Sequence, residues 1–216
     1  MFRLIASGLL LAALVAPAIG APLPPSLKMP TQEEPKKNEE PNIGNLADWI
    51  RSSNLAEVRD GMFYIDALRA KDPVTVFRRD KILGNTTASF QFKVEPVGQG
   101  ARAVGLIFGS TDGRTYHCIE IGRRDVVLYR VGPGGARTEL DRRGGFTKPD
   151  GNWFEAKIEC QGSLIRTFFD NKFLFAFTSP QLQPGYVGFY GFEGRSWVRR
   201  LDFEGKPAQL PQGWKP

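Results

Sequence analysis

Residues 153–160 read Trp-Phe-Glu-Ala-Lys-Ile-Glu-Cys, an alternation of apolar and charged side chains that starts at the second residue. In an extended chain, successive side chains point to opposite sides, so the apolar set falls on one face and the charged set on the other. Residues 88–94 (Ala-Ser-Phe-Gln-Phe-Lys-Val) repeat the alternation. Each segment therefore predicts a strand with one face in a core and the other in water.

Similar short segments recur from Ala56 to Phe203, and turn sequences separate them. Asp60-Gly61, Asp112-Gly113 and Pro133-Gly134-Gly135 are hairpin signals. The predicted strands are residues 56–58, 62–65, 74–77, 88–94, 103–109, 115–121, 126–131, 138–140, 153–160, 164–169, 173–177, 186–190 and 197–203. This spacing, with no amphipathic helix, predicts an all-β fold: a two-sheet antiparallel β-sandwich whose core takes most of the 16 phenylalanines.

The N-terminal region predicts export. Residues 1–20 combine Arg3, an apolar run from Leu9 to Val15 and small residues at the end, which is the pattern of a secretory signal peptide. Residues 21–46 are rich in proline, glutamate and lysine and hold few large apolar side chains. Such a segment buries too little surface to offset its ordering entropy, so it predicts a disordered tether.

The globular part is expected over residues 47–207 as one β-sandwich domain, followed by a C-terminal tail over residues 208–216. No stretch of the mature chain approaches the ~20 apolar residues that a membrane-spanning helix needs. The mature chain is therefore expected to have no transmembrane segment and to be secreted or periplasmic after cleavage of the signal peptide.

The chain is basic, with a formal net charge of +6. A positive balance of this size favours solubility or weak affinity for anionic glycans, cell walls or membrane surfaces. The arginine pairs Arg123-Arg124, Arg142-Arg143 and Arg199-Arg200 are scattered, without the interleaved aromatic residues of a single-strand binding surface. No nucleic-acid partner is expected.

Two cysteines, Cys118 and Cys160, leave two alternatives open. In an oxidising compartment they are a possible disulfide, which would close a long loop and stabilise the fold. They are nearly as well explained as two unpaired, packed thiols, since Cys160 shares a face with apolar residues while Cys118 alternates with Tyr116 and Glu120 and looks less buried. With one histidine in the chain, a catalytic cysteine is not expected.

The small number of histidines and cysteines also limits metal binding. One histidine and two distant cysteines cannot make a transition-metal cluster, so neither a metal site nor a cofactor is predicted. A structural calcium ion held by loop carbonyls and aspartates, for example around Asp112 or Asp150, stays open as an alternative.

From Trp49 to Gly205 the order of motifs resembles the concanavalin A-like or laminin-G-like jelly-roll superfamily, in particular the bacterial branch related to 3-keto-disaccharide hydrolase-like domains. The motifs that carry the resemblance are Val58-Arg59-Asp60-Gly61, Tyr116-His117-Cys118-Ile119-Glu120, Val126-Val127-Leu128-Tyr129, Asn152-Trp153, Gln161-Gly162, Asp170 and Pro184-Gly185-Tyr186-Val187-Gly188-Phe189. The resemblance implies two curved antiparallel sheets with a concave face that holds sugars or protein partners. This architecture supports lectins, glycosidases and adhesion modules alike, so the function must be argued from the site.

The expected catalytic acids are missing. Glycosidases of this fold that cleave β-glucans resemble one another in a Glu-x-Asp-x-Glu strand, and retaining chemistry needs two carboxyl groups about 5–5.5 Å apart. This chain has no such triplet, and its nearest acids, Glu120 and Asp125, cannot share a face of one regular strand. No catalytic residue is therefore assigned.

The best candidate site is the strand over residues 115–121. If His117 points inward with Ile119 and Ile121 it is a packed histidine; if it points outward it is a proton donor or a sugar contact. If His117 points inward, Tyr116 and Glu120 point to the groove, where they offer a ring and a carboxylate acceptor for a sugar. Arg123 and Tyr129 complete the set of candidate ligand-binding residues, which is Tyr116, His117, Glu120, Arg123 and Tyr129.

Two functional hypotheses follow. The first is an exported, non-catalytic jelly-roll module that binds a carbohydrate or cell-surface glycan on its concave face. The alternative is a glycoside-processing hydrolase of the 3-keto-disaccharide hydrolase-like branch, with Glu120 as the working carboxylate and His117 or Tyr116 assisting.

Overall fold

The structure is a computed structural model that describes residues 43, 46–97, 100, 102–145 and 150–209, all of which belong to one unit, Asn38–Pro216. The predicted signal peptide and nearly all of the predicted tether lie outside the described residues. Among the residues that are described, no helix has the length and hydrophobicity to cross a membrane.

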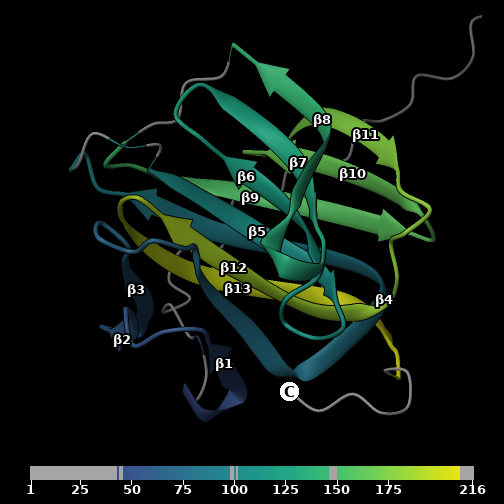
Figure 1. Cartoon of the computed structure of the whole chain (residues 1–216), viewed down its shortest axis with the longest axis horizontal. Helices are drawn as coiled ribbons and strands as arrows, with labels where there is room; N and C mark the ends of the chain where they lie inside the picture. The colour runs from purple at the N-terminus through teal and green to yellow at the C-terminus, as the bar shows by residue number, and fades with distance from the viewer. Residues whose placement is uncertain (1–42, 44–45, 98–99, 101, 146–149, 210–216) are drawn as a thin grey trace, which may run out of the picture. The chain divides into compact units, whose positions relative to one another are not determined.

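Strands make up nearly all of the regular structure (Figure 1). They are β1 (Trp49–Arg51), β2 (Ala56–Arg59), β3 (Met62–Asp66), β4 (Val74–Val94), β5 (Ala103–Ser110), β6 (Tyr116–Ile121), β7 (Asp125–Val131), β8 (Arg137–Gly144), β9 (Trp153–Gln161), β10 (Leu164–Phe169), β11 (Lys172–Thr178), β12 (Gly185–Phe192) and β13 (Arg195–Pro207). Two short 3-10 helices, η1 (Leu46–Asp48) and η2 (Pro133–Gly135), complete the fold. The all-β prediction is confirmed.

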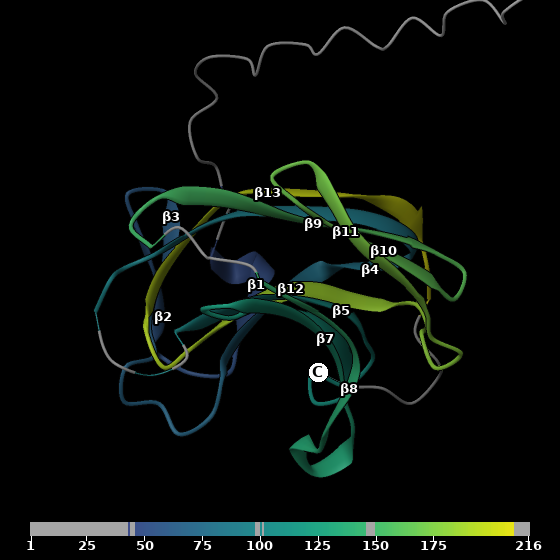
Figure 2. The same cartoon turned by 90° about the horizontal axis from the view of Figure 1, so that it is seen from above.

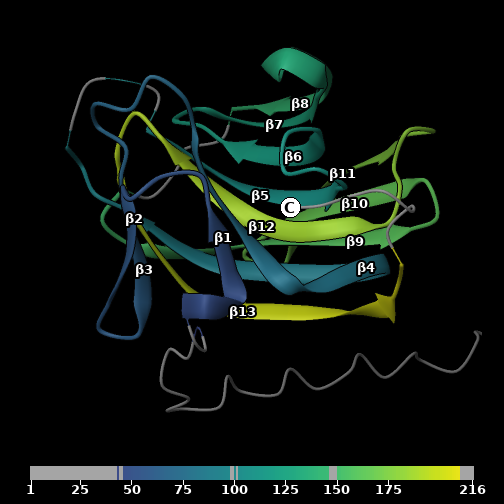
Figure 3. The same cartoon turned by 60° about the horizontal axis from the view of Figure 1, so that its bottom comes forward.

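The strands form two antiparallel layers that face each other (Figures 2 and 3). The first, which we call the β5 sheet, has the order β1-β4-β12-β5-β6-β7-β8. The second, the β9 sheet, has the order β2-β3-β13-β4-β9-β10-β11. In Figure 2 the ends of β7 and β8 at their connecting turn bend away from the β9 sheet, so the outer face of the β5 sheet is concave along these strands, while β8 contacts β11 at the edge of the two layers.

Strand β4 belongs to both layers. Its first half pairs with β1 and β12, and its second half pairs with β9 and β13. The sequence predicted two short strands at 74–77 and 88–94, and these are the two ends of this single 21-residue strand. The residues between them, with the charged run 78–81 and Gly84-Asn85, have the composition of a loop, but pairing with β12 and β13 around residue 83 keeps the chain extended, and the register with β12 shifts across the charged run.

Two of the hairpins have the expected turn geometry. Asp60 and Gly61 have φ values of 50° and 70°, and Asp170 and Asn171 have values of 44° and 61°. A positive φ at both central residues defines the turn that matches the right-handed twist of paired strands, and Asp, Asn and Gly adopt it at low cost. The turn dipeptides therefore set the β2–β3 and β10–β11 registers.

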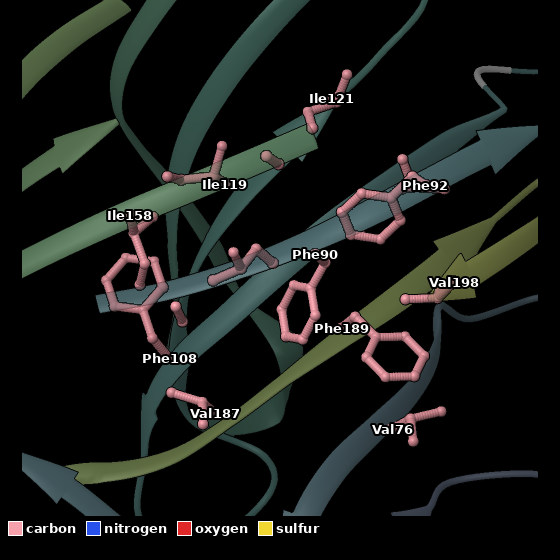
Figure 4. Close-up of a cluster of buried hydrophobic side chains, with 14 of the residues drawn as sticks. Val76, Phe90, Phe92, Phe108, Ile119, Ile121, Ile158, Val187, Phe189 and Val198 are labelled. Atoms are coloured by element: carbon pink, nitrogen blue, oxygen red, sulfur yellow. The ribbon is translucent and has the colours of Figure 1, made fainter. Parts of the chain in front are cut away.

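Between the two sheets lies a core of aliphatic and phenylalanine side chains (Figure 4). The Phe90 and Phe189 rings meet edge to face with centroids 5.5 Å apart, although they come from different sheets. Phe92 and Phe154 stack at 5.8 Å on neighbouring strands of the β9 sheet. The apolar side chains of the alternating segments 88–94 and 153–160 therefore point into the core, as predicted.

Candidate functional site

Strand β6 separates the core from the candidate site. His117, Ile119 and Ile121 face the β9 sheet, and both isoleucines belong to the core. Tyr116 and Cys118 lie on the opposite, outer face of the β5 sheet, where they join a second buried cluster. This is the register in which Tyr116 and Glu120 face outward.

The second cluster covers the concave face with large side chains, and we call it the outer cluster. Its buried members are Phe77, Ile107, Tyr116, Cys118, Val131, Tyr186 and Tyr190, with Ile50 and Phe192 partly buried against them. Gly105 makes this packing possible, because a Cβ atom there would overlap the Tyr190 ring. The concave face therefore has an aromatic floor rather than an open trough of small residues.

Glu120 is the polar centre of this floor. Its Oε2 accepts a hydrogen bond of 2.5 Å from the Tyr190 hydroxyl and another of 2.9 Å from the Arg137 guanidinium. The Arg137 guanidinium also lies over the rings of Tyr129 and Phe192, with its carbon 5.5 Å and 6.0 Å from their centroids. One arginine thus neutralises the carboxylate and joins β6 and β7 to β8 and β12.

Burial keeps the phenols of the outer cluster protonated. It raises the pKa of Tyr116 to about 12, and the neighbouring Cys118 adds to that increase. Burial also raises the pKa of Tyr190 well above its usual value, with Cys118 and Glu120 contributing in the same direction. Both hydroxyls are therefore neutral hydrogen-bond donors near pH 7.

A groove opens over this floor, between three loops. Tyr116, Val131 and Phe192 line its base, and its volume is about 560 Å³, within the range of small-molecule sites. The walls are the segment before β4, the β5–β6 turn and the β7–β8 turn, and their lining residues are Lys71, Asp72, Pro73, Gly113, Arg114, Gly134 and Gly135. A second, smaller pocket of about 280 Å³ shares Tyr116 and Val131 with the groove.

His117 lies on the core side and takes no part in the groove floor. Its Nε2 forms a 2.8 Å hydrogen bond with the Ser179 hydroxyl, and its ring stacks on Phe108 with centroids 5.8 Å apart. Burial, and secondarily the charge of Arg130, lower its pKa to about 4. The structural alternative for this histidine, a packed ring with a satisfied nitrogen, is the one observed.

The remaining predicted ligand-binding residues lie apart from one another. Tyr129 is on β7, opposite Cys118, and its ring faces the same side as the groove floor. Arg123 is exposed in the β6–β7 turn, at the end of β6 away from Tyr116, and does not line the groove. The turn carries Arg123 past the end of the strand face, and its role as a ligand contact stays a prediction.

The cysteines are not bonded to each other. Cys118 belongs to the outer cluster, on the outer face of the β5 sheet, whereas Cys160 belongs to the core between the two sheets. The disulfide alternative is therefore not observed. Cys118 is 2% exposed, which corrects the expectation that it is the less buried of the two. Burial raises the pKa of the Cys160 thiol to about 12, which makes it a poor nucleophile.

The aspartates considered for calcium have protein partners. The Asp112 carboxylate accepts hydrogen bonds from the Arg114 and Thr115 backbone and from the Thr115 hydroxyl. Asp150 forms a 3.0 Å ion pair with Arg102. In the part of the chain that the structure describes, no three His, Cys, Asp or Glu side chains gather as a metal site would require.

The sequence analysis missed Arg137, Tyr190 and Phe192. Tyr190 and Phe192 follow the alternation of 185–192, where positions 186, 190 and 192 are aromatic, so a search for outward aromatic positions in that strand could have found them. Arg137 carries no comparable signal, because its role depends on the pairing of β8 with β7.

No protein-family model matches the sequence, and no curated protein matches it. Solved structures of similar fold include the carbohydrate-binding module CBM66 from Bacillus subtilis, with 11% identity over 76% of this chain and 100% of that chain and a TM-score of 0.67. They also include a protein of unknown function with a galectin-like fold from Bacillus subtilis, with 9% identity over 76% and 91% and a TM-score of 0.61. The Bacillus licheniformis β-glucanase has 13% identity over 78% and 97% and a TM-score of 0.58.

These similarities show the fold alone, an antiparallel β-sandwich of the jelly-roll kind, and they are consistent with the resemblance to the concanavalin A-like superfamily. At such low sequence identity, the similarities are evidence for the fold and not for the activity. The finer likeness to 3-keto-disaccharide hydrolase-like domains stays a prediction.

Proposed function

We propose that this chain is an exported jelly-roll module that binds a carbohydrate or cell-surface glycan in the groove of its β5 sheet and does not cleave it. The observation that carries the proposal is the groove itself, a volume of about 560 Å³ with aromatic side chains at its base and polar loops around it. The apolar face of a sugar ring packs on aromatic rings, while its hydroxyls need polar partners at the edges. Tyr116 and Phe192 supply the aromatic rings, and the loops supply the polar partners.

Support from known structures is by analogy of fold. The Bacillus subtilis module is a carbohydrate-binding protein by name, and it aligns over its whole length with this chain. Export rests on the signal-peptide pattern of residues 1–20. N-terminal sequencing of the protein recovered outside the cytoplasm should begin near Ala21, and recovery of the uncleaved chain from the cytoplasm would contradict the export part.

Calorimetric titration against cell-wall and plant polysaccharides tests binding. At least one should bind, and Phe192→Ala should weaken it by about fivefold or more through loss of an aromatic contact. Phe173→Ala is the matched control, because Phe173 is 58% exposed on the β9 sheet, away from the groove. Absence of binding to every polysaccharide, or equal losses in both variants, would argue against the groove.

The alternative, a glycoside-processing hydrolase, rests on Glu120, a carboxylate that is paired with the groove residue Arg137 and has 14% of its side chain exposed. Binding is favoured over cleavage because Tyr190 and Arg137 both engage the same oxygen of this carboxylate. Incubation of the purified protein with ordinary and oxidised disaccharides decides between the two. Product formation that Glu120→Gln abolishes would establish the hydrolase instead.

A further inference from the structure

Each wall of the groove carries one cationic side chain. Lys71 stands on the segment before β4, Arg114 on the β5–β6 turn and Arg137 at the start of β8. The segments are far apart in sequence, and only the fold brings them around the base formed by Tyr116 and Phe192. The arrangement is therefore a property of the groove rather than of one basic stretch.

The acids near the groove do not cancel this charge. Asp72 is the one carboxylate among the lining residues, against the two lining cations Lys71 and Arg114, because the charge of Arg137 is already balanced by Glu120. Glu120 lies at the floor and is already paired with Arg137. Among the residues that the structure describes, no carboxylate lies within ion-pair distance of Lys71 or Arg114, so these two charges face the solvent of the groove.

The side chain of Arg137 and the backbone that carries Arg114 are held in place. Arg137 is fixed by Glu120 and by the rings of Tyr129 and Phe192. The loop that carries Arg114 is closed by Asp112, whose carboxylate accepts hydrogen bonds from the Arg114 and Thr115 backbone. A pre-organised cation loses less entropy on binding than a mobile one, so both positions are suited to hold an anionic group.

The shape of the groove strengthens the effect of these charges. A concave site with low-dielectric walls focuses the field of like charges and raises the local concentration of an oppositely charged ligand. The formal net charge of +6 acts in the same direction. The glycines at 134 and 135 leave the third wall without bulk, so the space beside Arg137 stays open for a charged group.

We propose that the ligand of this groove is an acidic saccharide, whose carboxylate or sulfate groups pair with Lys71, Arg114 and Arg137 while a sugar ring packs on Tyr116 and Phe192. The inference rests on the proposed binding function and specifies its ligand class. The mechanism is one of charge recognition, with Arg137 as the fixed contact on the floor and the two solvent-facing cations as the selective contacts at the rim.

The test uses two matched pairs of probes: polygalacturonate with its methyl ester, and heparin with its desulfated and carboxyl-reduced form. The purified chain should bind at least one acidic member and bind its neutralised partner at least about tenfold more weakly, and the affinity should fall as salt is raised. If the neutralised partners bind as tightly as the acidic ones, the acidic-ligand inference is overturned while carbohydrate binding stands. If no glycan of any kind binds, the proposed function fails as well.

A double variant tests whether the acidic probe binds at the two exposed cations of the groove. Lys71→Ala with Arg114→Ala should weaken binding of the acidic probe by about tenfold, or about 1.4 kcal/mol, because two exposed charge pairs with the ligand are lost. Arg124→Ala with Lys172→Ala removes the same charge from exposed positions on the β6–β7 turn and on β11, outside the groove, and should leave the affinity nearly unchanged. Equal losses in the two double variants would show that net charge, and not the groove, holds the ligand. Thermal unfolding of both variants confirms that all four exposed substitutions leave the fold intact.

Discussion

The two faces of the β5 sheet are both buried, yet they are built from different chemistry. The inner face packs Leu106, Ile119 and Phe189 against the β9 sheet, and nearly all of its side chains are hydrocarbon. The outer face packs Tyr116 and Tyr190 together with an ion pair between Glu120 and Arg137. The inner face is covered by another sheet, whereas the outer face is walled by loops.

This difference separates packing from recognition. A face that is covered by a sheet gains most from apolar area, because any polar atom there must find a partner among side chains that have none to offer. A face that borders a groove can keep phenol hydroxyls, a carboxylate and a guanidinium, because they satisfy one another and meet solvent at the rim. Four predictions test whether the two faces differ as described.

The largest effect is expected for Phe189→Ala on the inner face. Phe189 is fully buried against Phe63 and Phe90, so its removal should leave a cavity and destabilise the protein by about 4 kcal/mol. Phe192→Ala, three residues along the same strand on the outer face, should cost about 1 kcal/mol because the side chain is only partly buried. Urea unfolding measures both, and equal losses would remove the contrast between the faces.

Gly105→Ala tests the tight packing of the outer face. A Cβ atom at 105 would overlap the Tyr190 ring, which is fully buried and has little room to move, so a loss of about 3 kcal/mol is expected. Gly144→Ala is the control, since its Cβ atom would meet nothing within 4 Å. A change of less than about 0.5 kcal/mol is expected there. Similar stability of the two variants in thermal unfolding would show that the outer cluster is loosely packed.

His117 gives the inner face a pH dependence. Its pKa in the folded protein is about 4, below the usual 6.5, so the unfolded chain binds the proton more tightly and stability falls as pH drops from about 6.5 to about 4. Because the two pKa values differ by about 2.5, full protonation is expected to cost about 3 kcal/mol. Unfolding free energies measured across this range should fall less steeply for His117→Gln, which can keep a hydrogen bond to Ser179 without gaining a charge. Parallel profiles for the two proteins would contradict the assignment.

Tyr190→Phe has the smallest predicted effect and probes the polar centre of the outer face. It removes the hydroxyl that donates to Glu120 and should destabilise the protein by about 1–2 kcal/mol. Combined with Glu120→Gln, the losses should be smaller than their sum, because both changes disrupt the same hydrogen bond. Strict additivity in the double-mutant cycle would mean that the two side chains do not interact.

Much of the fold could be predicted from local patterns. The alternation in 88–94 and 153–160 and the turn residues at Asp60-Gly61 and Asp170-Asn171 specify strands and hairpins, because side-chain direction and turn type are properties of a few consecutive residues. The single long strand β4 was not predicted. Its middle has the composition of a loop, and only pairing partners from distant parts of the chain make it extended.

The candidate site was predicted in part. Alternation was enough to place Tyr116 and Glu120 on one face of β6 and His117 on the other. The side chains that complete the floor, Arg137 and Tyr190, come from β8 and β12, and no local pattern says that these strands lie near β6. The order of strands in a sheet is a nonlocal property, so the groove could not be assembled from the sequence.

By itself, the sequence determined the class of fold, which side chains of a strand share a face, and the basic charge of the chain, because periodicity, turn chemistry and composition are local or additive quantities. The tertiary structure alone decided that Lys71, Arg114 and Arg137 surround one aromatic floor, that Cys118 and Cys160 stay apart, and that His117 is bonded to Ser179. Each of these depends on distances between residues far apart in the chain. Such distances are set by how two sheets twist and pack against each other, and no single strand encodes that packing.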